Sequence, residues 1–282
     1  MTRFYRYHAI GNDYIVIRER SLEPGGLTPA LARRICHRNF GVGSDGILLH
    51  LRDKENRFVL RIFNPDGSES EKSGNGLRIF ARYLWDRRLV GSDPFTVLTP
   101  AGEVTCKVTD DGRMVTVDMG MLTFDSAKIP VAGPQREVLR ERFTIDGEAL
   151  EYSCASIGNP HCVLLRDRLS EDETRRFGPL IEVEPRFPNR TNVQFMQVLD
   201  RANIAIQIWE RGAGFTLASG SSSSAAAGVA RRLGLCDDDI TVHMPGGTIR
   251  IEIGNGYAVR MTGPVTHISD GEIDPECLAG AR

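Results

Sequence analysis

The chain has 282 residues, of which 41% are hydrophobic, and a formal net charge of −2 at pH 7. This length and composition predict one large or two ordinary globular domains with buried cores. The balanced charge, without a basic stripe, argues against binding to nucleic acid or to a membrane surface, and the lack of any apolar run of about 18 residues argues against a membrane span.

The start of the chain and its cysteines bear on where the protein works. The first residues, Met1-Thr2-Arg3-Phe4, do not open the long apolar segment of a signal peptide. Six cysteines are scattered without CxxC spacing: Cys36, Cys106, Cys154, Cys162, Cys236 and Cys277. In a chain of this length they indicate reduced thiols, not a disulfide framework or a zinc site. We therefore expect a soluble cytoplasmic protein without a metal site.

Strand-like segments dominate the first half of the chain. β-branched or alternating runs bounded by turn residues predict strands at 14–17, 47–50, 58–63, 95–98, 104–108 and 114–119. Thr28 as a cap, with Pro29 in the first turn, predicts a helix over 29–38. A second, apolar helix is expected directly after Ser73-Gly74-Asn75-Gly76.

The second half repeats this pattern. Strands are predicted at 143–145, 162–165, 193–198, 204–208, 248–253 and 258–261, and one apolar helix follows Ser219-Gly220. Many strands around one convincing helix per half predict an α+β fold with two pseudo-symmetric domains. Each domain is expected to be a curved, mostly antiparallel sheet or barrel wrapped around its central helix.

Short polar motifs recur at a nearly constant offset. Ser73-Gly74 precedes Ser219-Gly220 by 146 residues (219 − 73), and Asn12 precedes Asn159 by 147 (159 − 12). Asn64 with Glu210 (210 − 64 = 146) and Ser44 with Asn192 (192 − 44 = 148) continue the series. We interpret this as a duplicated domain with one shared site; a chance alignment of common turn residues is the alternative. The predicted halves are residues 1–121, joined by 265–282, and residues 122–264.

The two Ser-Gly turns are open to two interpretations. A serine before a helix is a good N-cap in any protein. The free N–H groups and the positive dipole end of such a helix also form a site for a carboxylate or phosphate. Because the turn occurs twice, in matched positions, we favour anion binding.

Charged and polar groups near these turns could serve catalysis or structure. Glu210 and Arg211 end an apolar strand; they form either a minor surface ion pair or a group that orients the reaction and a fork that binds a carboxylate. His161 is either a buried structural histidine or an acid/base partner. The asparagines are either turn formers or ligands for an amino acid's polar groups: Asn12, Asn64, Asn159 and Asn192.

Together these motifs resemble diaminopimelate epimerase over essentially the whole chain. The resemblance is carried, in order, by Gly11-Asn12-Asp13-Tyr14, Gly41-Val42-Gly43-Ser44-Asp45-Gly46, Phe63-Asn64-Pro65-Asp66-Gly67-Ser68, Ser73-Gly74-Asn75-Gly76, Gly158-Asn159-Pro160-His161, Arg190-Thr191-Asn192 and Glu210-Arg211-Gly212-Ala213-Gly214. In that family two pseudo-symmetric domains close over the amino acid without a cofactor. The resemblance implies conversion of LL- to meso-diaminopimelate, a precursor of lysine and peptidoglycan, and suggests a homodimer.

The resemblance also implies roles for individual residues. Substrate would be held by Asn12, Asn64, Asn159, Asn192, Glu210 and Arg211, and its α-carboxylate by backbone N–H groups at Gly74, Asn75, Gly220 and Ser221. His161 and Glu210 would assist the acid/base pair. In the family that pair is two cysteines, one for each face of the α-carbon. Here Ser73 and Ser219 stand at those two positions, and a serine hydroxyl is much harder to ionise than a thiol.

Three interpretations follow from these serines. The chain is an epimerase whose acid/base positions are Ser73 and Ser219, or a diverged isomerase or lyase that uses Glu210 or His161 as a single base. The third alternative is a catalytically inactive protein that binds a diamino acid.

Overall fold

The computed structural model describes residues 2–22 and 25–279, which divide into two compact units. The first unit holds the residues up to Asp118 together with those from Gly263 onward, and the second is Met119–Thr262. The chain therefore passes between the units twice, in β8 and in β17. None of the helices among the described residues is long and apolar enough to cross a bilayer.

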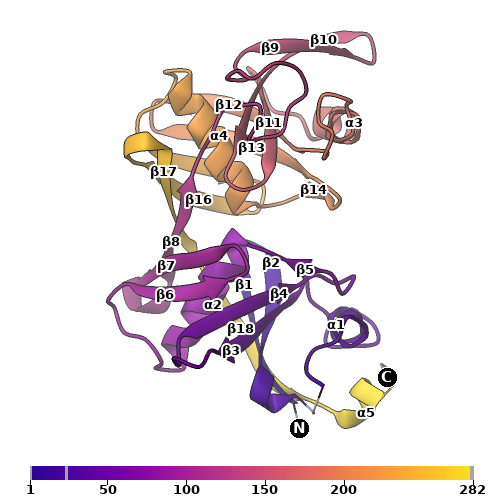
Figure 1. Ribbon diagram of the computed structural model, residues 1–282, viewed down its shortest axis with the longest axis vertical. Coiled ribbons are helices and arrows are strands. Elements are labelled where there is room, and N and C mark those ends of the chain that lie inside the picture. The colour runs from indigo at the N-terminus through magenta and orange to yellow at the C-terminus, as the bar shows by residue number, and fades with distance from the viewer. Residues whose placement is uncertain (1, 23–24, 280–282) are drawn as a thin grey trace. The chain divides into compact units, whose positions relative to one another are not determined.

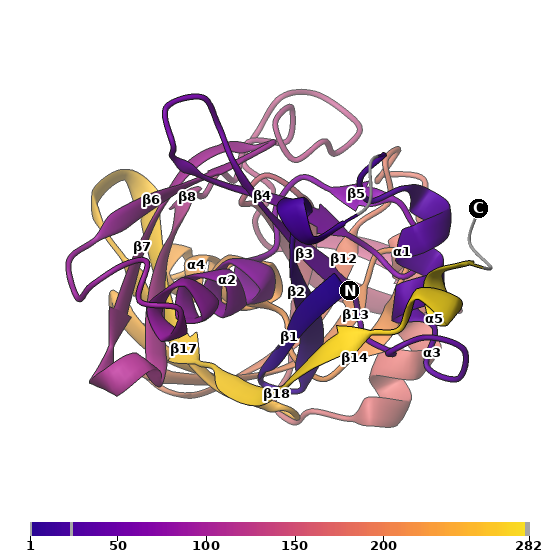
Figure 2. The ribbon, with the colours of Figure 1, turned by 90° about the horizontal axis from the view of Figure 1, so that it is seen from below.

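The first unit is a sheet wrapped around one helix (Figure 1). Its strands are β1 (Thr2–Ala9), β2 (Asn12–Arg18), β3 (Ile47–Arg52), β4 (Phe58–Phe63), β5 (Glu69–Ser70), β6 (Phe95–Thr99), β7 (Gly102–Thr109), β8 (Met114–Met121) and β18 (Thr266–Ile273). Its α-helices are α1 (Pro29–Cys36), α2 (Gly74–Asp86) and α5 (Pro275–Ala279). β2 and β3 are parallel, as are β4 and β6, and the other pairs are antiparallel. β18, from the end of the chain, runs beside β1 (Figure 2).

The second unit repeats this order of pairing. Its strands are β9 (Glu141–Ile145), β10 (Glu148–Ser156), β11 (Pro160–Leu165), β12 (Asn192–Asp200), β13 (Asn203–Glu210), β14 (Gly214–Thr216), β15 (Asp239–Met244), β16 (Gly247–Ile253) and β17 (Ala258–Pro264). Its α-helices are α3 (Glu171–Glu182) and α4 (Gly220–Arg232). β11 and β12 are parallel, as are β13 and β15, and the other pairs are antiparallel. The strands β10 to β17 thus pair as β1 to β8 do.

The two central helices are buried on nearly all sides. In α2 the residues from Gly74 to Ala81 are all buried, and in α4 the buried residues include the run Ser222–Ala230. Helices that are apolar or small all round are stable only inside a protein. Small side chains let the chain approach α4 closely, since a Cβ added to Gly228 would lie 2.4 Å from Cδ1 of Leu122.

The predicted α+β class is confirmed, while some local predictions were incomplete. The predicted helix over 29–38 ends at Cys36, because the next residue, His37, is extended. Helix α3 was not predicted, since Gly178 and Pro179 interrupt its pattern; Ser170 caps it by accepting a bond from the N–H of Glu173 at 3.2 Å. The strands β1, β5, β10, β14, β15 and β18 were also missed.

Candidate active site

The first Ser-Gly turn caps α2. Ser73 is extended, and its Oγ accepts a hydrogen bond of 3.0 Å from the N–H of Gly76. Ser73 is half-buried, whereas Gly74 and Asn75 in the first helical turn are buried. The first N–H groups of a helix have no partner inside it and lie at the positive end of its dipole. The cap is therefore observed, and anion binding at the same turn stays a proposal.

Asn12, the first residue of β2, is joined to that helical turn. Its Nδ2 donates to Oδ2 of Asp45 at 3.0 Å, and its Oδ1 accepts from Nδ2 of Asn75 at 3.1 Å. The fully buried Arg78 donates to Oδ1 of Asn75 at 2.7 Å. Burial lowers the pKa of the Arg78 guanidinium to about 10. Two predicted site residues, Asn12 and Asn75, thus lie together at the start of α2.

Asn64 belongs to a separate turn in the same unit. Its Nδ2 donates to Oγ of Ser68 at 3.0 Å, and that hydroxyl donates to Oδ1 of Asp66 at 2.6 Å. Half-buried, the Asn64 side chain stabilises the turn between β4 and β5. Among the described residues no hydrogen bond joins it to Asn12 or Asn75.

The second Ser-Gly turn couples a cap to a carboxyl group. Ser219 is buried, and its Oγ accepts from the N–H of Ser222 at 3.4 Å. Its hydroxyl also lies near Glu210, the last residue of β13. Burial raises the pKa of the Glu210 carboxyl, and the Ser219 hydroxyl partly opposes that shift. A carboxylate with a raised pKa accepts protons more readily than an ordinary one.

The serine run after Ser219 is fully hydrogen-bonded. Ser223 and Ser224 donate to the carbonyl oxygens four residues earlier, at 2.8 Å each. The other two serines accept bonds from side chains of the sheet and its turn, Ser221 from Nδ2 of Asn159 at 3.4 Å and Ser222 from Nε2 of Gln194 at 3.0 Å. These bonds attach the first turn of α4 to β12 and to the turn before β11.

His161 lies on β11 and is fully buried. Its Nε2 is 3.0 Å from Oδ1 of Asn159. Burial lowers the pKa of His161 to about 3; the nearby Gln194 side chain raises it, and the charge of Arg211 lowers it. The imidazole is therefore neutral near pH 7. Asn159 connects this neutral ring to Ser221, so the structure brings three predicted site residues together.

Asn192 and Arg211 support the turn that carries Glu210. The Asn192 side chain donates to the carbonyl oxygen of Pro160 at 2.8 Å and accepts from the N–H of Arg211 at 3.0 Å. Arg211 is exposed, and its Nη1 donates to the carbonyl oxygen of Asn189 at 2.9 Å. The buried Glu182 accepts from the N–H of Gly212 at 2.9 Å. Asn192 thus fixes the backbone on either side of the site with both ends of its amide.

Comparison of the chain with known proteins identifies its relatives. A family model described as diaminopimelate epimerase matches residues 4–124 and 153–268. The chain belongs to the diaminopimelate epimerase family. It is 55% identical to diaminopimelate epimerase 2 of a Nostoc species, over 98% of this chain and 97% of that protein. It is 40% identical to the diaminopimelate epimerase of Moorella thermoacetica, over 95% of this chain and 98% of that protein.

Solved structures with the same fold are more distant in sequence. A PhzF-family phenazine biosynthesis protein from Bacillus anthracis superposes with a TM-score of 0.68 at 16% identity, over 97% of this chain and 99% of that one. A hydroxyproline epimerase from Agrobacterium vitis gives 0.67 at 14% identity, over 98% and 94%. At such low identity the likeness shows the fold alone.

The cysteines of this family member lie outside the two capping turns. Five of the six are buried. Burial raises the pKa of Cys106 to about 12 and also raises the pKa of Cys154, which lies opposite Cys162 on the neighbouring strand. The hydroxyls of Ser73 and Ser219 therefore remain the groups at the starts of α2 and α4.

Several residues of the network were missed in the sequence. Asp45 was identified only as part of a motif, although its carboxylate accepts hydrogen bonds from Nδ2 of Asn12 and from the N–H of Asp13. Gln194 stands inside the apolar run of β12, where a fully buried amide needs a partner. A polar residue in a strand that is buried on both faces is the signal that could have found it.

Proposed function

We propose that the chain is a cofactor-independent epimerase that inverts the α-carbon of diaminopimelate, from the LL to the meso form. The observation that carries this proposal is the Glu210 carboxyl near Ser219, the capping residue of α4, with a pKa that burial raises. It supplies a proton acceptor with a raised pKa beside the first N–H groups of a helix. Inversion by proton transfer needs both features, a base for the α-proton and fixed positive charge for the carboxylate.

We assign the substrate α-carboxylate to the backbone N–H groups of Gly74 and Asn75 in the first unit and of Gly220 and Ser221 in the second. These groups are the unpaired donors of α2 and α4. Negative charge that develops on the carboxylate as the α-proton leaves is stabilised by the same donors and by the helix dipoles. We assign the remaining polar groups of the substrate to the asparagines and arginine of the family motifs: Asn12, Asn64, Asn159, Asn192 and Arg211.

The proton leaves through the second unit in this proposal. Ser219 Oγ takes the α-proton while its own proton passes to the Glu210 carboxylate. The electron pair of the C–H bond remains on the substrate as an enolate of the held carboxylate. Glu210 thereby ends protonated and Ser219 remains a neutral hydroxyl, so no free serine alkoxide forms.

The proton returns from the opposite face in the same proposal. Ser73 holds a hydroxyl in the equivalent position of the first unit and donates its proton to the α-carbon while a solvent water returns a proton to Oγ in the same step, so that no alkoxide forms here either. The hydroxide that remains is neutralised through solvent by the proton that Glu210 holds. His161 is neutral and serves as a hydrogen-bonding partner that orients Asn159 and, through it, Ser221.

A second candidate is a one-base isomerase or lyase. It is favoured by the difference between the serines: the Ser219 hydroxyl is near enough to Glu210 to act on its pKa, whereas no carboxylate in the described part of the first unit is hydrogen-bonded to the Ser73 hydroxyl. One base can move a proton along a substrate, but it returns the proton to the face from which it came. A one-base enzyme would therefore tolerate Ser73→Ala and would not invert the α-carbon.

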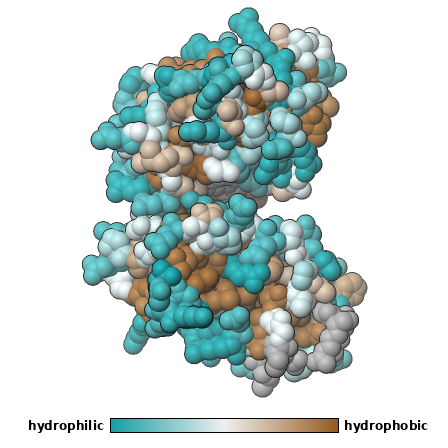
Figure 3. Space-filling view, viewed as in Figure 1, coloured by the Kyte–Doolittle hydropathy of each residue, from teal (hydrophilic) through white to brown (hydrophobic). Residues whose placement is uncertain are grey.

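We also propose a cytoplasmic homodimer that binds the small diamino acid and needs no cofactor. Support for an assembly comes from the first unit, where β18 pairs with β1 and carries the exposed Ile268. Hydrophobic residues are also visible on the face of this unit that Figure 3 shows. Sedimentation of the purified chain at several concentrations tests the dimer.

Deuterium wash-in tests the activity. LL-diaminopimelate is incubated in D₂O with the chain and with the Ser73→Cys/Ser219→Cys variant, and α-deuterium and the LL-to-meso ratio are followed. An epimerase incorporates deuterium with inversion. Exchange without inversion supports the one-base candidate, and exchange by neither protein overturns both. A thermal shift with the same amino acid then shows whether the chain only binds it.

A further inference from the structure

The two units differ at one buried position beside their central helices. On the parallel pair β2 and β3, Val16 lies opposite Leu48, and on β11 and β12 Val163 lies opposite Gln194. Leu48 and Gln194 are 146 residues apart (194 − 48) and are equivalent in the duplicated sheet. The helical residues that they face are equally spaced, since Gly76 and Ser222 are also 146 apart (222 − 76).

In the first unit this contact is apolar. A Cβ added to Gly76 would lie 3.0 Å from Cδ2 of Leu48, so the leucine packs directly on the helix. In the second unit the amide of Gln194 donates to the hydroxyl of Ser222 at 3.0 Å instead. Both side chains are fully buried there. Burying two polar groups where a leucine and a glycine suffice requires a compensating bond.

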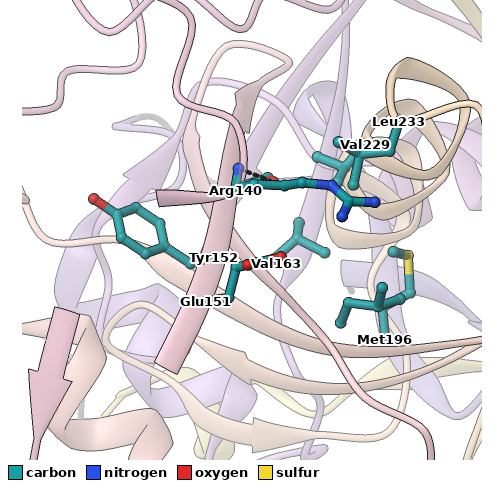
Figure 4. A pocket seen from close by; sticks show the side chains of 9 residues that line it. Arg140, Glu151, Tyr152, Val163, Met196, Val229 and Leu233 are labelled. Carbon is teal, nitrogen blue, oxygen red and sulfur yellow. Dashed lines mark hydrogen bonds between the residues drawn. The ribbon is translucent and has the colours of Figure 1, made fainter. Parts of the chain in front are cut away.

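Packing alone does not require the polar pair of Gln194 and Ser222. Farther along the same face of β11 and β12, the layer under α4 is lined mainly by apolar residues and encloses a hollow of only about 10 Å³, which is room for about one water molecule (Figure 4). Val163, Met196, Val229 and Leu233 line it. Gln194 thus lies at the edge of this layer, opposite Val163.

On the other side Gln194 approaches His161. The two residues lie on the same face of the parallel pair, since His161 is two positions before Val163, the partner of Gln194. The Gln194 side chain is near enough to the imidazole to act on its pKa, which it raises. Nδ1 of His161 and Oε1 of Gln194 are both buried and have no hydrogen-bond partner among the described residues. Nδ1 is a ring nitrogen that can carry a proton and donate it in a hydrogen bond, whereas Oε1 is an amide oxygen that accepts one.

Neutral histidine carries its proton on one ring nitrogen only. Oε1 of Gln194 is fully buried and has no access to water, whereas Asn159 is half-exposed and its amide can turn. A proton on Nδ1 satisfies both buried atoms, and leaving each unsatisfied would cost about 1–3 kcal/mol. Asn159 then donates its NH₂ to Nε2 and accepts from the Ser221 hydroxyl.

We propose that Gln194, held by Ser222, is a positioning residue that fixes the Nδ1-protonated tautomer of His161. Nε2 is then the unprotonated ring nitrogen, and it faces Asn159 and the first turn of α4. The role in turnover rests on the proposed function, because it matters only if His161 orients the site for α-proton transfer. The tautomer itself does not depend on turnover.

Nitrogen NMR of ¹⁵N-histidine-labelled protein tests the tautomer directly. The chain has six histidines, and the His161 signals are those missing from the His161→Asn variant. Between about pH 5 and 8 we expect nitrogen shifts of a neutral ring protonated at Nδ1. An Nε2-protonated ring in the unchanged protein would overturn the proposal outright, whether or not the protein turns over substrate.

The first unit supplies the matched variant. Gln194→Leu/Ser222→Gly installs the Leu48 and Gly76 pair, which packs in the equivalent place, and it should move the proton to Nε2. Gln194→Glu keeps an acceptor and should preserve the Nδ1 proton. If the unchanged protein, Gln194→Leu/Ser222→Gly and Gln194→Glu all have the same His161 tautomer, the role of Gln194 is overturned.

Activity assays then separate the two proposals. Misplacement of the site should lower α-deuterium exchange by about 10- to 100-fold in the leucine–glycine variant, with the thermal shift by diaminopimelate retained. Exchange unchanged in that variant, despite a moved proton, would overturn the role of Gln194 in turnover. If the unchanged protein does not exchange, the proposed function fails and the tautomer is still decided by NMR.

Discussion

Nδ2 of Asn75 donates a hydrogen bond of 3.1 Å to Oδ1 of Asn12, which joins the first turn of α2 to the first residue of β2. The second unit has the corresponding bond, from Nδ2 of Asn159 to Oγ of Ser221 at 3.4 Å. The residues are matched by offsets of 147 (159 − 12) and 146 (221 − 75). The duplication thus extends from strand order to individual side-chain contacts, with the donor now on the strand side.

Removing the first of these contacts should be the more costly change. Asn75→Ala deletes the bond to Asn12 and leaves the buried Arg78 without the Asn75 acceptor. An unsatisfied buried polar group costs about 1–3 kcal/mol of unfolding free energy, and more when it is charged. Urea denaturation measures the loss.

Ser221→Ala is the matched control in the second unit. Its contact is longer and links two neutral groups, so we expect a loss below about 1 kcal/mol. Equal losses in the two variants would contradict the stabilising role assigned to the Asn75–Arg78 bond.

Restoring thiols at the two capping positions should accelerate proton exchange. A thiol has a pKa near 8.5, and a helix N-terminus lowers it further, so Cys at both positions supplies thiolate near pH 7. For Ser73→Cys/Ser219→Cys we expect α-deuterium exchange to rise by about 10²-fold or more, the scale of positioned acid–base catalysis.

The Ser73→Ala/Ser219→Ala variant controls for the caps. It removes the acceptors for Gly76 and Ser222 and should destabilise each helix start by about 1 kcal/mol. Its exchange should fall below that of the unchanged chain. Exchange at the same rate in the alanine and cysteine variants would show that neither position transfers protons.

The fold class was readable from the sequence because its signals are local. Alternating and β-branched runs marked most strands, and Ser73 and Ser219 marked both central helices with caps that the structure contains. Helix α3 escaped because Gly178 and Pro179 are poor helix formers, and tertiary packing overrides them: a Cβ on Gly178 would lie 2.6 Å from the Trp209 ring. Glycine is required there by the close approach of the ring.

The candidate site was only partly readable from the sequence. The repeat pointed to Asn12, Asn159 and the Ser-Gly turns because they recur at fixed offsets. Gln194 breaks the repeat, since its counterpart is Leu48, and so a search for recurring motifs passes over it. The pairing of Ser219 with Glu210 depends on the end of β13 meeting the start of α4, which no local pattern encodes.

Glu210→Gln should abolish exchange and stabilise the protein near pH 7. Because burial raises the pKa of Glu210, the folded state keeps its proton to higher pH than the unfolded chain does. The unchanged protein therefore loses stability relative to the variant as pH rises from about 4.3 through the raised pKa. Thermal unfolding of both proteins across this range measures the difference.

The pH dependence of α-deuterium exchange by the unchanged protein should also reflect the pKa of Glu210. The base form of Glu210 is needed to take the proton, so exchange should fall as pH drops through the raised pKa. Exchange in Glu210→Gln should be lower by about 10²–10⁴-fold. A variant that exchanges normally, or that gains no stability relative to the unchanged protein between pH 4 and pH 7, would contradict the assigned role.

His161 should make the second unit sensitive to acid. Burial holds its pKa near 3, below about 6.5 in the unfolded chain, so the unfolded state binds the extra proton. This stability is fully present above about pH 6.5 and is lost as pH falls toward 3, by about 1.4 kcal/mol per pH unit. His161→Asn removes that dependence, and urea denaturation at successive pH values compares the two proteins. His50, buried in the first unit with its pKa lowered to about 4, provides the comparison. His50→Asn should remove a similar loss over the narrower range from about pH 6.5 to 4. Parallel curves of unfolding free energy against pH for the unchanged protein and His161→Asn would show that His161 carries a proton in the folded state.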